Sequence, residues 1–306
     1  MSAWDWSRLA ALDLPALLCG SALALAASSA GTLLLLRRQG LFADGLSHAV
    51  LPGVVLAFLW TGSRAPAVLL AGGLSAGLVL ALATRATARR APLDAGAVLG
   101  ALYPLFFAFG LLLLEGASGG DLDLAPSHVL FGQLEQLAWR APSDLEGWLD
   151  PASYRRLPGL VWHSLGLWLG SALWLRLAGR ALFASGFDPV GARLLGLRPG
   201  LFEAATLVCC AAIAVGLFQV GGVVLALALL LVPAACARLL TDRYRTQFRL
   251  AALFGVLLIW AGYGLAVFLL PALLGTQSLS AAGGISSLAG LLLLGVARFG
   301  PRRARV

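Results

Sequence analysis

The chain has 306 residues, of which 60% are hydrophobic and 12% are charged, and its mean hydropathy is +0.90. No soluble core could bury so much apolar surface, so the composition predicts an all-α polytopic membrane protein. The net charge of +8 comes from short arginine clusters that lie between apolar runs. Because no aromatic residues interleave with these clusters, they indicate membrane topology and argue against a nucleic-acid partner.

All 22 basic residues are arginine. A chain without lysine has no P-loop, whose phosphate grip needs that residue, and it has no Schiff-base chemistry. If this protein is driven by ATP, hydrolysis therefore takes place in another chain. The four cysteines have no metal-type spacing and are predicted to be small core residues: Cys19, Cys209, Cys210 and Cys236.

At about 20 residues per membrane span, the apolar segments are expected near residues 15–36, 43–60, 65–84, 93–114, 160–180, 203–218, 220–240, 248–272 and 281–298. The total is eight or nine spans, because 203–240 is short for two. With alternating loops, 17 of the 22 arginines fall on one side. The positive-inside rule then predicts an outside N-terminus, nine spans and a cytoplasmic C-terminal tail. Eight spans with an inside N-terminus is the alternative.

Two titratable side chains lie near the start of the second apolar segment. Asp44 and His48 are four residues apart, so they project from one helix face and can reach a single cation. Ionisable groups in a membrane span are costly and by default mark an ion or substrate path. The pair predicts a channel site for manganese, zinc or ferrous iron, among which ligand type alone does not choose. In the structural alternative, Asp44 bonds Arg37, Arg38 or the backbone, and His48 packs against a neighbouring helix.

The connection between the fourth and fifth segments, residues 115–159, is long and acidic. It is too polar to cross the membrane, and it is predicted to lie on the extracytoplasmic side. Residues 127–139 are amphipathic enough to lie at the membrane interface, with Trp139 and Trp148 as anchors. The loop either docks a partner, gathers cations or is a solvated connection.

The loop 181–200 contains the signals of a short capped helix. Asp188 can cap a helix whose first residue is Pro189, and Gly196 can close it after about two turns. The predicted helix is leucine-rich on one side and carries Arg193 on the other. Such a rigid cytoplasmic element suits a cleft on a partner protein, and a plain linker between spans is the alternative.

Residues 218–240 contain features that shape a membrane helix. Gly221 and Gly222 allow close approach of backbones, and Pro233 interrupts the helical hydrogen bonds in the middle of the span. These three residues are predicted to serve helix packing and gating.

Five stretches of the chain together resemble the integral-membrane permease family of ABC-type zinc, manganese and iron importers. They occur in the order of the family and cover most of the chain: Leu33–Gly53, Leu93–Leu114, His128–Leu134, Phe187–Leu197 and Gln219–Thr241. Within them, the SHAVLPG and FDP…AR…GL pieces are the specific ones. The resemblance implies a single permease domain over residues 1–306, with the polar loop 115–159 outside and the coupling region 181–200 in the cytoplasm.

The resemblance also implies partners and residue roles. Two cytoplasmic ATPase subunits, an extracytoplasmic metal-binding protein and a second copy of this chain or a paralogous permease are expected. Asp44 and His48 fall on the family's channel metal-site positions. The coupling helix that contacts the ATPase falls on Phe187, Asp188, Ala192, Arg193 and Gly196. The sequence departs from the family pattern at Ala43, Val190 and Gly191.

The sequence therefore predicts a multi-pass permease of the bacterial plasma membrane that imports divalent manganese, zinc or iron. It is not itself an enzyme and binds no permanent cofactor, since the metal is cargo and a partner chain uses the ATP. One alternative is a permease for a metal chelate such as a siderophore or cobalamin, which needs no ionisable pair in its channel. The other alternative is a protein of a different class, either a stand-alone secondary transporter or an intramembrane enzyme.

Overall fold

The computed structural model describes residues 9–63, 65–90, 93–117, 134, 137–139, 150–275 and 279–300. In this part of the chain all regular secondary structure is helical, which confirms the all-α prediction. The helices long enough to span a membrane are α2 (Leu14–Leu36), α3 (Gly40–Thr61), α4 (Pro66–Arg90), α5 (Ala95–Ala117), α9 (Gly159–Phe187), α11 (Pro199–Leu240), α12 (Tyr244–Gly264) and α14 (Ala281–Phe299). Shorter elements are α8 (Pro151–Tyr154), α10 (Pro189–Leu194), α13 (Leu270–Leu274) and the π-helical turns η1 (Leu9–Asp13) and η3 (Leu265–Leu269).

The helices correspond to the predicted spans. Seven helices of the described residues are both long and apolar enough to cross a membrane. One of them, α11, is 42 residues long and contains two predicted spans on either side of a break at Gly222. Helix α9 coincides with the predicted span 160–180, but it continues through Phe187 because residues 181–187 contain no charged residue or proline, and Asp188 and Pro189 then end the helix. All nine predicted segments are therefore helical, but α9 is not among the seven helices that are apolar enough to cross a membrane.

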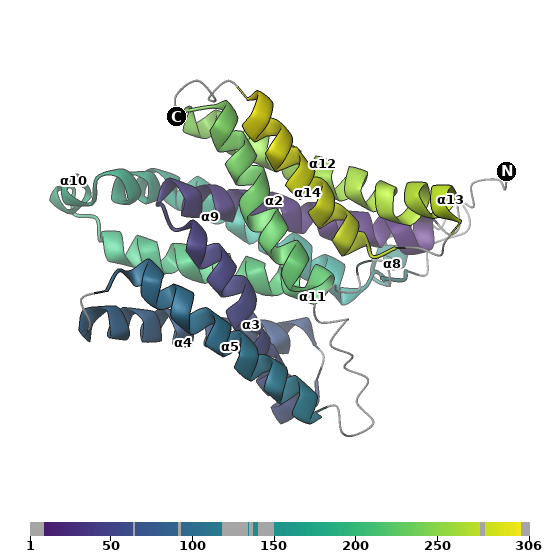
Figure 1. The fold of residues 1–306 in the computed structure, drawn as a ribbon, viewed down its shortest axis with the longest axis horizontal. Helices are drawn as coiled ribbons and strands as arrows, with labels where there is room; N and C mark the ends of the chain where they lie inside the picture. Colours follow the sequence, from purple (N-terminus) through teal and green to yellow (C-terminus); the bar gives the residue numbers. More distant parts are fainter. Residues whose placement is uncertain are drawn as a thin grey trace.

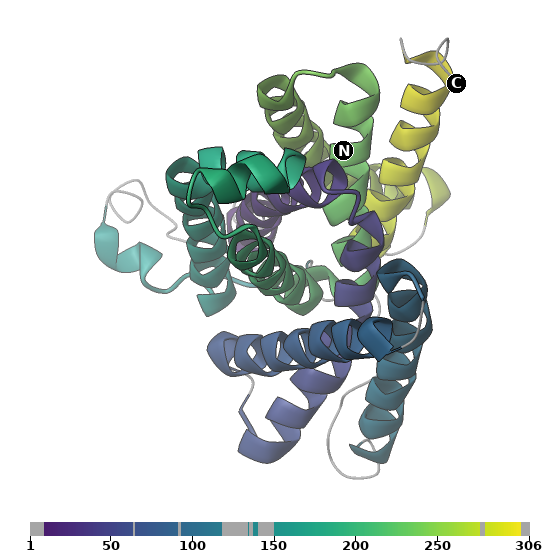
Figure 2. The ribbon, with the colours of Figure 1, turned by 90° about the vertical axis from the view of Figure 1, so that its left-hand side faces the viewer.

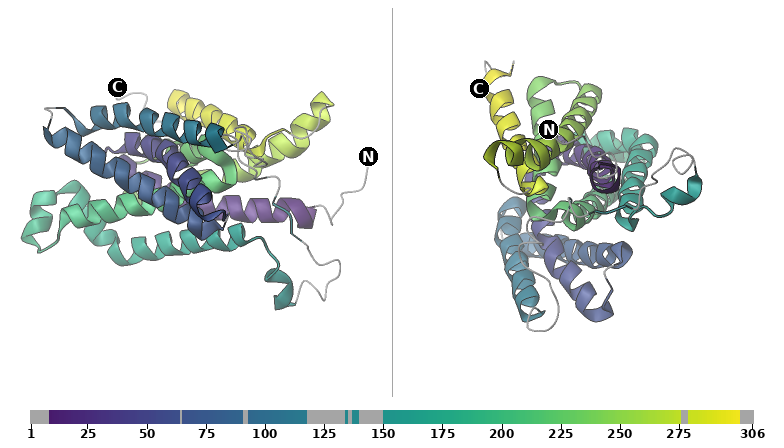
Figure 3. Two further views of the ribbon diagram at one scale, coloured as in Figure 1. Left: turned by 90° about the horizontal axis from the view of Figure 1, so that it is seen from below. Right: turned by 90° about the vertical axis from the view of Figure 1, so that its right-hand side faces the viewer.

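The two ends of the helix bundle carry different elements. In Figure 1, α10 and the end of α14 lie on the left, whereas the start of α2, α8 and α13 lie on the right. The end-on and side views of Figures 2 and 3 show the same long bundle from other directions. Opposite ends for the first and last spans require an odd number of crossings, so this arrangement favours nine spans over eight.

The core of the bundle is built around α2, which packs against α9, α11 and α12. Small residues permit these contacts: a Cβ atom at Gly31 would collide with the carbonyl group of Leu230 on α11. The buried Asp13 carboxylate accepts a hydrogen bond from the Tyr263 hydroxyl at 2.6 Å. This bond joins η1, which directly precedes α2, to the end of α12, which directly precedes η3.

A second group of helices carries the candidate site. Helix α3 packs against α4, α5 and α11. Gly53 of α3 faces Gly72 of α4 so closely that a Cβ atom on either would meet the other's backbone. This contact fixes α3 against α4, and α5 packs against both of these helices. The cysteines Cys19, Cys210 and Cys236 are buried in the core and Cys209 is half-buried, so the prediction for them is confirmed.

Most of the loop 115–159 lies outside the described residues, including Trp148 and most of the predicted interfacial stretch. Trp139 is described, and it is not a lipid anchor: only 2% of its surface is exposed. Its backbone N–H donates to the Ala11 carbonyl at 2.7 Å and its indole N–H to the Ser153 carbonyl at 3.3 Å. Both hydrogen bonds of Trp139 are made inside the protein, and a sequence pattern alone cannot reveal such partners.

Candidate metal site and coupling helix

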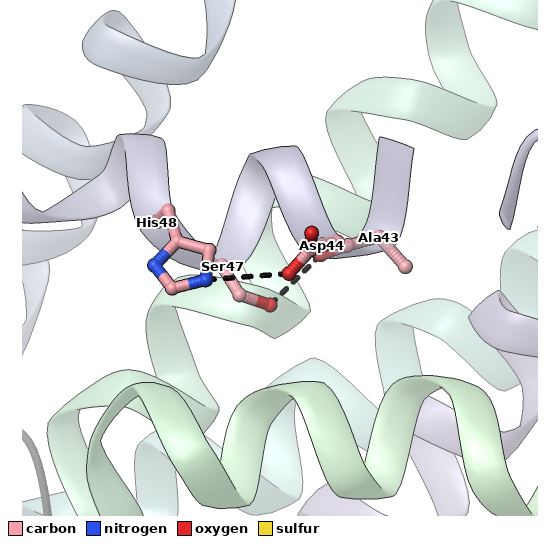
Figure 4. A network of polar contacts seen from close by, with 4 residues as sticks. All are labelled: Ala43, Asp44, Ser47 and His48. Atoms are coloured by element: carbon pink, nitrogen blue, oxygen red, sulfur yellow. Dashed lines mark hydrogen bonds and ion pairs between the residues drawn. The ribbon is translucent and has the colours of Figure 1, made fainter. Parts of the chain in front are cut away.

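The first three turns of α3 bring the predicted metal ligands together. The Nε2 atom of His48 lies 3.3 Å from the Oδ1 atom of Asp44 (Figure 4), and about a fifth of each side chain is exposed. Ser47, between them in sequence, is buried and donates its hydroxyl hydrogen to the Ala43 carbonyl at 2.8 Å. The Ser47 hydroxyl therefore bonds to the backbone of its own helix. The Asp44 carboxylate and the His48 imidazole remain directed at each other.

Aromatic residues of α5 surround the imidazole of His48. The Tyr103 ring stacks on it with centroids 5.5 Å apart, and the Phe107 ring meets it edge-on at 4.8 Å. The Tyr103 side chain also interacts with the Asp44 carboxylate. The Nδ1 atom of His48 is buried and has no hydrogen-bond partner among the described residues. The ring is thus oriented by packing, with Nε2 turned towards Asp44.

The spacing of the two ligand atoms suits a metal ion. Zinc lies about 2.0–2.1 Å from a histidine nitrogen and about 2.0–2.2 Å from a carboxylate oxygen, so two ligands in one tetrahedral or octahedral shell are about 2.9–3.5 Å apart. The observed 3.3 Å falls in this range. Among the described residues, no cluster of three or more His, Cys, Asp or Glu side chains exists that could hold a metal. The described residues therefore offer two side-chain ligands and leave the other coordination positions open.

The structural alternative for the pair is only partly supported. Arg37, which could have neutralised Asp44, instead donates to the Leu182 carbonyl at 3.1 Å and to the Ser185 hydroxyl at 3.3 Å, both on α9. The ionic partner of Asp44 is His48. His48 does pack against a neighbouring helix, as that alternative expects, but this packing leaves Nε2 facing the carboxylate.

The predicted cytoplasmic helix is present as α10. The Asp188 carboxylate accepts a hydrogen bond from the Gly191 N–H at 2.8 Å, Pro189 is the first helical residue, and Gly196 ends the helix with φ = +77°. These local features confirm the capping prediction. Ala192 is buried on the side of α10 that packs against α9 and α11, whereas Arg193 is exposed.

Large apolar side chains of α10 and its flanks face away from the protein. The exposed fractions are 67% for Phe187, 65% for Val190, 85% for Leu194 and 77% for Leu195. Because α10 lies at the arginine-rich end of the bundle, these side chains are not explained by contact with lipid. They are typical of a surface that is covered by a partner.

The break in α11 lies at one of the predicted positions. Gly222 has φ = 69° and ψ = −171°, a backbone conformation that residues other than glycine rarely adopt. Pro233 lies within a helical stretch instead, without a comparable backbone break. Gly221 is buried and packs against Leu225. The gating role of these three residues stays a prediction.

Tyr103 and Phe107 belong to the candidate site and were not singled out from sequence. Their spacing of four residues on an apolar helix is also that of ordinary core residues. The useful signal was a tyrosine within an otherwise apolar segment, because a phenol hydroxyl in such surroundings usually has a polar partner. That partner, Asp44, is supplied by a different helix.

The fold is that of a polytopic membrane protein, with a carboxylate and an imidazole on one of its apolar helices. The family model described as "ABC 3 transport family" matches residues 11–140 and 162–276. The chain belongs to this family and is a multi-pass permease of the bacterial plasma membrane.

Curated relatives carry transport names. The manganese transport system membrane protein MntC of Halalkalibacterium halodurans is 32% identical over 76% of this chain and 70% of its own length. The zinc transport system membrane protein TroC of Treponema pallidum is 32% identical over 76% of this chain and 72% of its own length. PsaBC from Streptococcus pneumoniae, solved in complex with Fab, aligns with a TM-score of 0.74 and 22% identity over 95% of this chain and 93% of that chain, which shows the shared fold.

Proposed function

We propose that this chain is the permease subunit of an ATP-driven importer of manganese or zinc ions, and that the ion passes between Asp44 and His48. The observation that carries the proposal is the 3.3 Å approach of a carboxylate oxygen and an imidazole nitrogen on an apolar helix. The names of the relatives support transition-metal ions as cargo. Iron, which the site chemistry also admits, stays a prediction.

The open coordination positions indicate how the ion is released. Two ligands bind weakly, and a transported ion must leave its site as readily as it enters. Water, or Asp44 and His48 of a second permease subunit, completes the shell while the ion is bound. The partly exposed faces of both side chains leave room for this second set of ligands.

ATP acts through partner chains, because this chain has no lysine and hence no P-loop. Two ATPase subunits bind at α10, where the exposed apolar side chains lie, and an extracytoplasmic metal-binding protein delivers the ion at the opposite end. Movement of α10 switches the helices between two arrangements that open the site to one side or the other. The break at Gly222 gives α11 a point at which its two halves change their angle.

Uptake of radioactive manganese, zinc and iron, in separate assays, tests the proposed function. Cells that produce this chain with its ATPase and metal-binding protein are expected to accumulate manganese or zinc, and cells that lack the ATPase are not. Uptake by this chain alone would support a stand-alone transporter. Uptake of a siderophore or cobalamin without free-ion uptake would support the chelate permease instead.

Replacing Tyr103 with phenylalanine is expected to raise the KM for metal uptake about tenfold, with little change in the maximal rate, because a group that orients a metal ligand typically contributes about 10–100-fold in affinity. The phenylalanine keeps the ring stacked on His48 and removes only the hydroxyl that interacts with Asp44. Tyr154→Phe, on α8 far from the site in sequence, is the matched control. An unchanged KM in Tyr103→Phe would show that the hydroxyl does not position the carboxylate.

A further inference from the structure

The turn between α2 and α3 connects the candidate metal site with the two helices that carry α10. This α2–α3 turn consists of Arg37, Arg38 and Gln39. It is tight: the Gln39 N–H donates to the Leu34 carbonyl at 2.8 Å. Among the described residues, Arg38 is the only one other than glycine with positive φ, at 57°. A bulky residue in this conformation is strained unless its surroundings hold it there.

On one side, the α2–α3 turn is attached to the end of α9. The Arg37 guanidinium donates from Nη2 to the Leu182 carbonyl at 3.1 Å and to the Ser185 hydroxyl at 3.3 Å. Both residues lie in the last turns of α9, directly before Phe187 and the cap of α10. Arg37 therefore holds the element that leads into α10.

On the other side, the α2–α3 turn is attached to the start of α11. The Gln39 side chain donates from Nε2 to the Glu203 Oε1 atom at 3.0 Å. Glu203 lies in the first turns of α11, which follows α10 directly. Burial lowers the pKa of the Arg37 guanidinium from its usual value, and the Glu203 carboxylate opposes this shift. The two flanks of α10 thus contact the same turn, α9 through Arg37 and α11 through Gln39.

The α2–α3 turn also leads directly into the candidate site. Helix α3 begins at Gly40 and is continuous past Asp44 and His48. Asp44 is five residues after Gln39, about 7.5 Å along the helix axis at the usual rise per residue. Since this stretch has no break, a displacement of Gln39 carries Asp44 and His48 with it.

We propose that the α2–α3 turn transmits movement of α10 to the metal ligands, with Arg37 and Gln39 as the connecting residues. This inference rests on the proposed function. By its bond to a carbonyl near the end of α9, Arg37 could serve only as a cap for that helix. A cap for α9 would not need the same turn to bind α11 as well and to continue directly into α3, and this turn does both.

The test compares metal uptake with ATP hydrolysis in proteoliposomes that contain this chain with its ATPase and metal-binding protein, with manganese and zinc ions as the probes. Arg37→Gln and Gln39→Ala are expected to lower the number of ions taken up per ATP hydrolysed about tenfold, the effect of losing one hydrogen bond to a charged group. ATP hydrolysis itself should stay within about twofold of the wild type, since neither Arg37 nor Gln39 is one of the exposed apolar side chains of α10 at which the ATPase is proposed to bind. Arg38→Gln, which removes an exposed arginine from the same turn, is the matched control and should keep the wild-type ratio.

A reciprocal exchange adds a second test. Gln39→Glu combined with Glu203→Gln reverses the direction of the hydrogen bond and is expected to restore the ratio that Gln39→Ala loses. The proposal is overturned if Arg37→Gln and Gln39→Ala keep the wild-type ratio. It is also overturned if uptake and hydrolysis fall in equal proportion in both, as a loss of folded complex would produce. A wild-type complex that hydrolyses ATP without moving either metal would instead overturn the proposed function.

Discussion

Replacing Asp44 or His48 with alanine is expected to reduce metal uptake by at least about 100-fold, because loss of a direct ligand costs more than the about 10–100-fold lost with an outer-shell partner. Because the described residues supply two side-chain ligands at this site, each variant leaves one, and one ligand cannot select an ion against water. The measurement is radiometal uptake at matched amounts of protein. ATP hydrolysis by the assembled complex should remain, since neither residue lies near α10.

Two matched variants separate loss of the site from loss of a charge or a ring. Asp94→Asn removes a carboxylate that caps α5 by accepting from the Gly96 N–H at 2.8 Å, and asparagine can also cap. His163→Ala removes a histidine of α9. Both are expected to retain uptake. Normal uptake in Asp44→Ala and His48→Ala would reduce the pair to structural residues and reopen the chelate alternative.

The candidate ligands could be predicted because the information is local. Asp44 and His48 are one helical turn apart, so any α-helix through them places both on one face. The cap of α10 is local in the same way: Asp188, Pro189 and Gly196 each act within a few residues. The membrane spans follow from apolar composition, which needs no tertiary contact.

What surrounds the ligands could not be predicted, because it depends on which helices pack together. Tyr103 and Phe107 reach His48 only through the packing of α5 on α3. Arg37 was a possible partner of Asp44 by sequence distance, but α9 offers it a carbonyl and a hydroxyl. A long flexible side chain has many partners within reach, and only the fold selects one.

The break in α11 illustrates a second limit of sequence patterns. Proline and glycine both interrupt helices, and residues 218–240 contain both. The structure breaks at Gly222 and keeps Pro233 within a helical stretch. A proline costs one hydrogen bond, which neighbouring groups in a bundle can replace, whereas φ = 69° with an extended ψ is open essentially to glycine alone. Whether a helix breaks at a glycine or at a proline therefore depends on the helices that pack against it.

Replacing Leu194 with aspartate is expected to weaken assembly with the ATPase by at least about 100-fold, since burying a leucine contributes about 1.5–3 kcal/mol and burial of an unpaired charge adds a further penalty. Leu194 is 85% exposed on α10, so the substitution leaves the permease's own packing unchanged. Co-purification of the ATPase with the tagged permease measures assembly directly.

The matched control is Leu194→Met, which keeps an apolar side chain of similar volume at the same position and should retain both assembly and uptake. Leu194→Asp should lose both, while its abundance in the membrane stays at the wild-type level because no buried contact is removed. If the ATPase co-purified normally with Leu194→Asp, the exposed apolar side chains of α10 would not be the contact. ATP-driven movement would then have to enter the permease elsewhere than through α10.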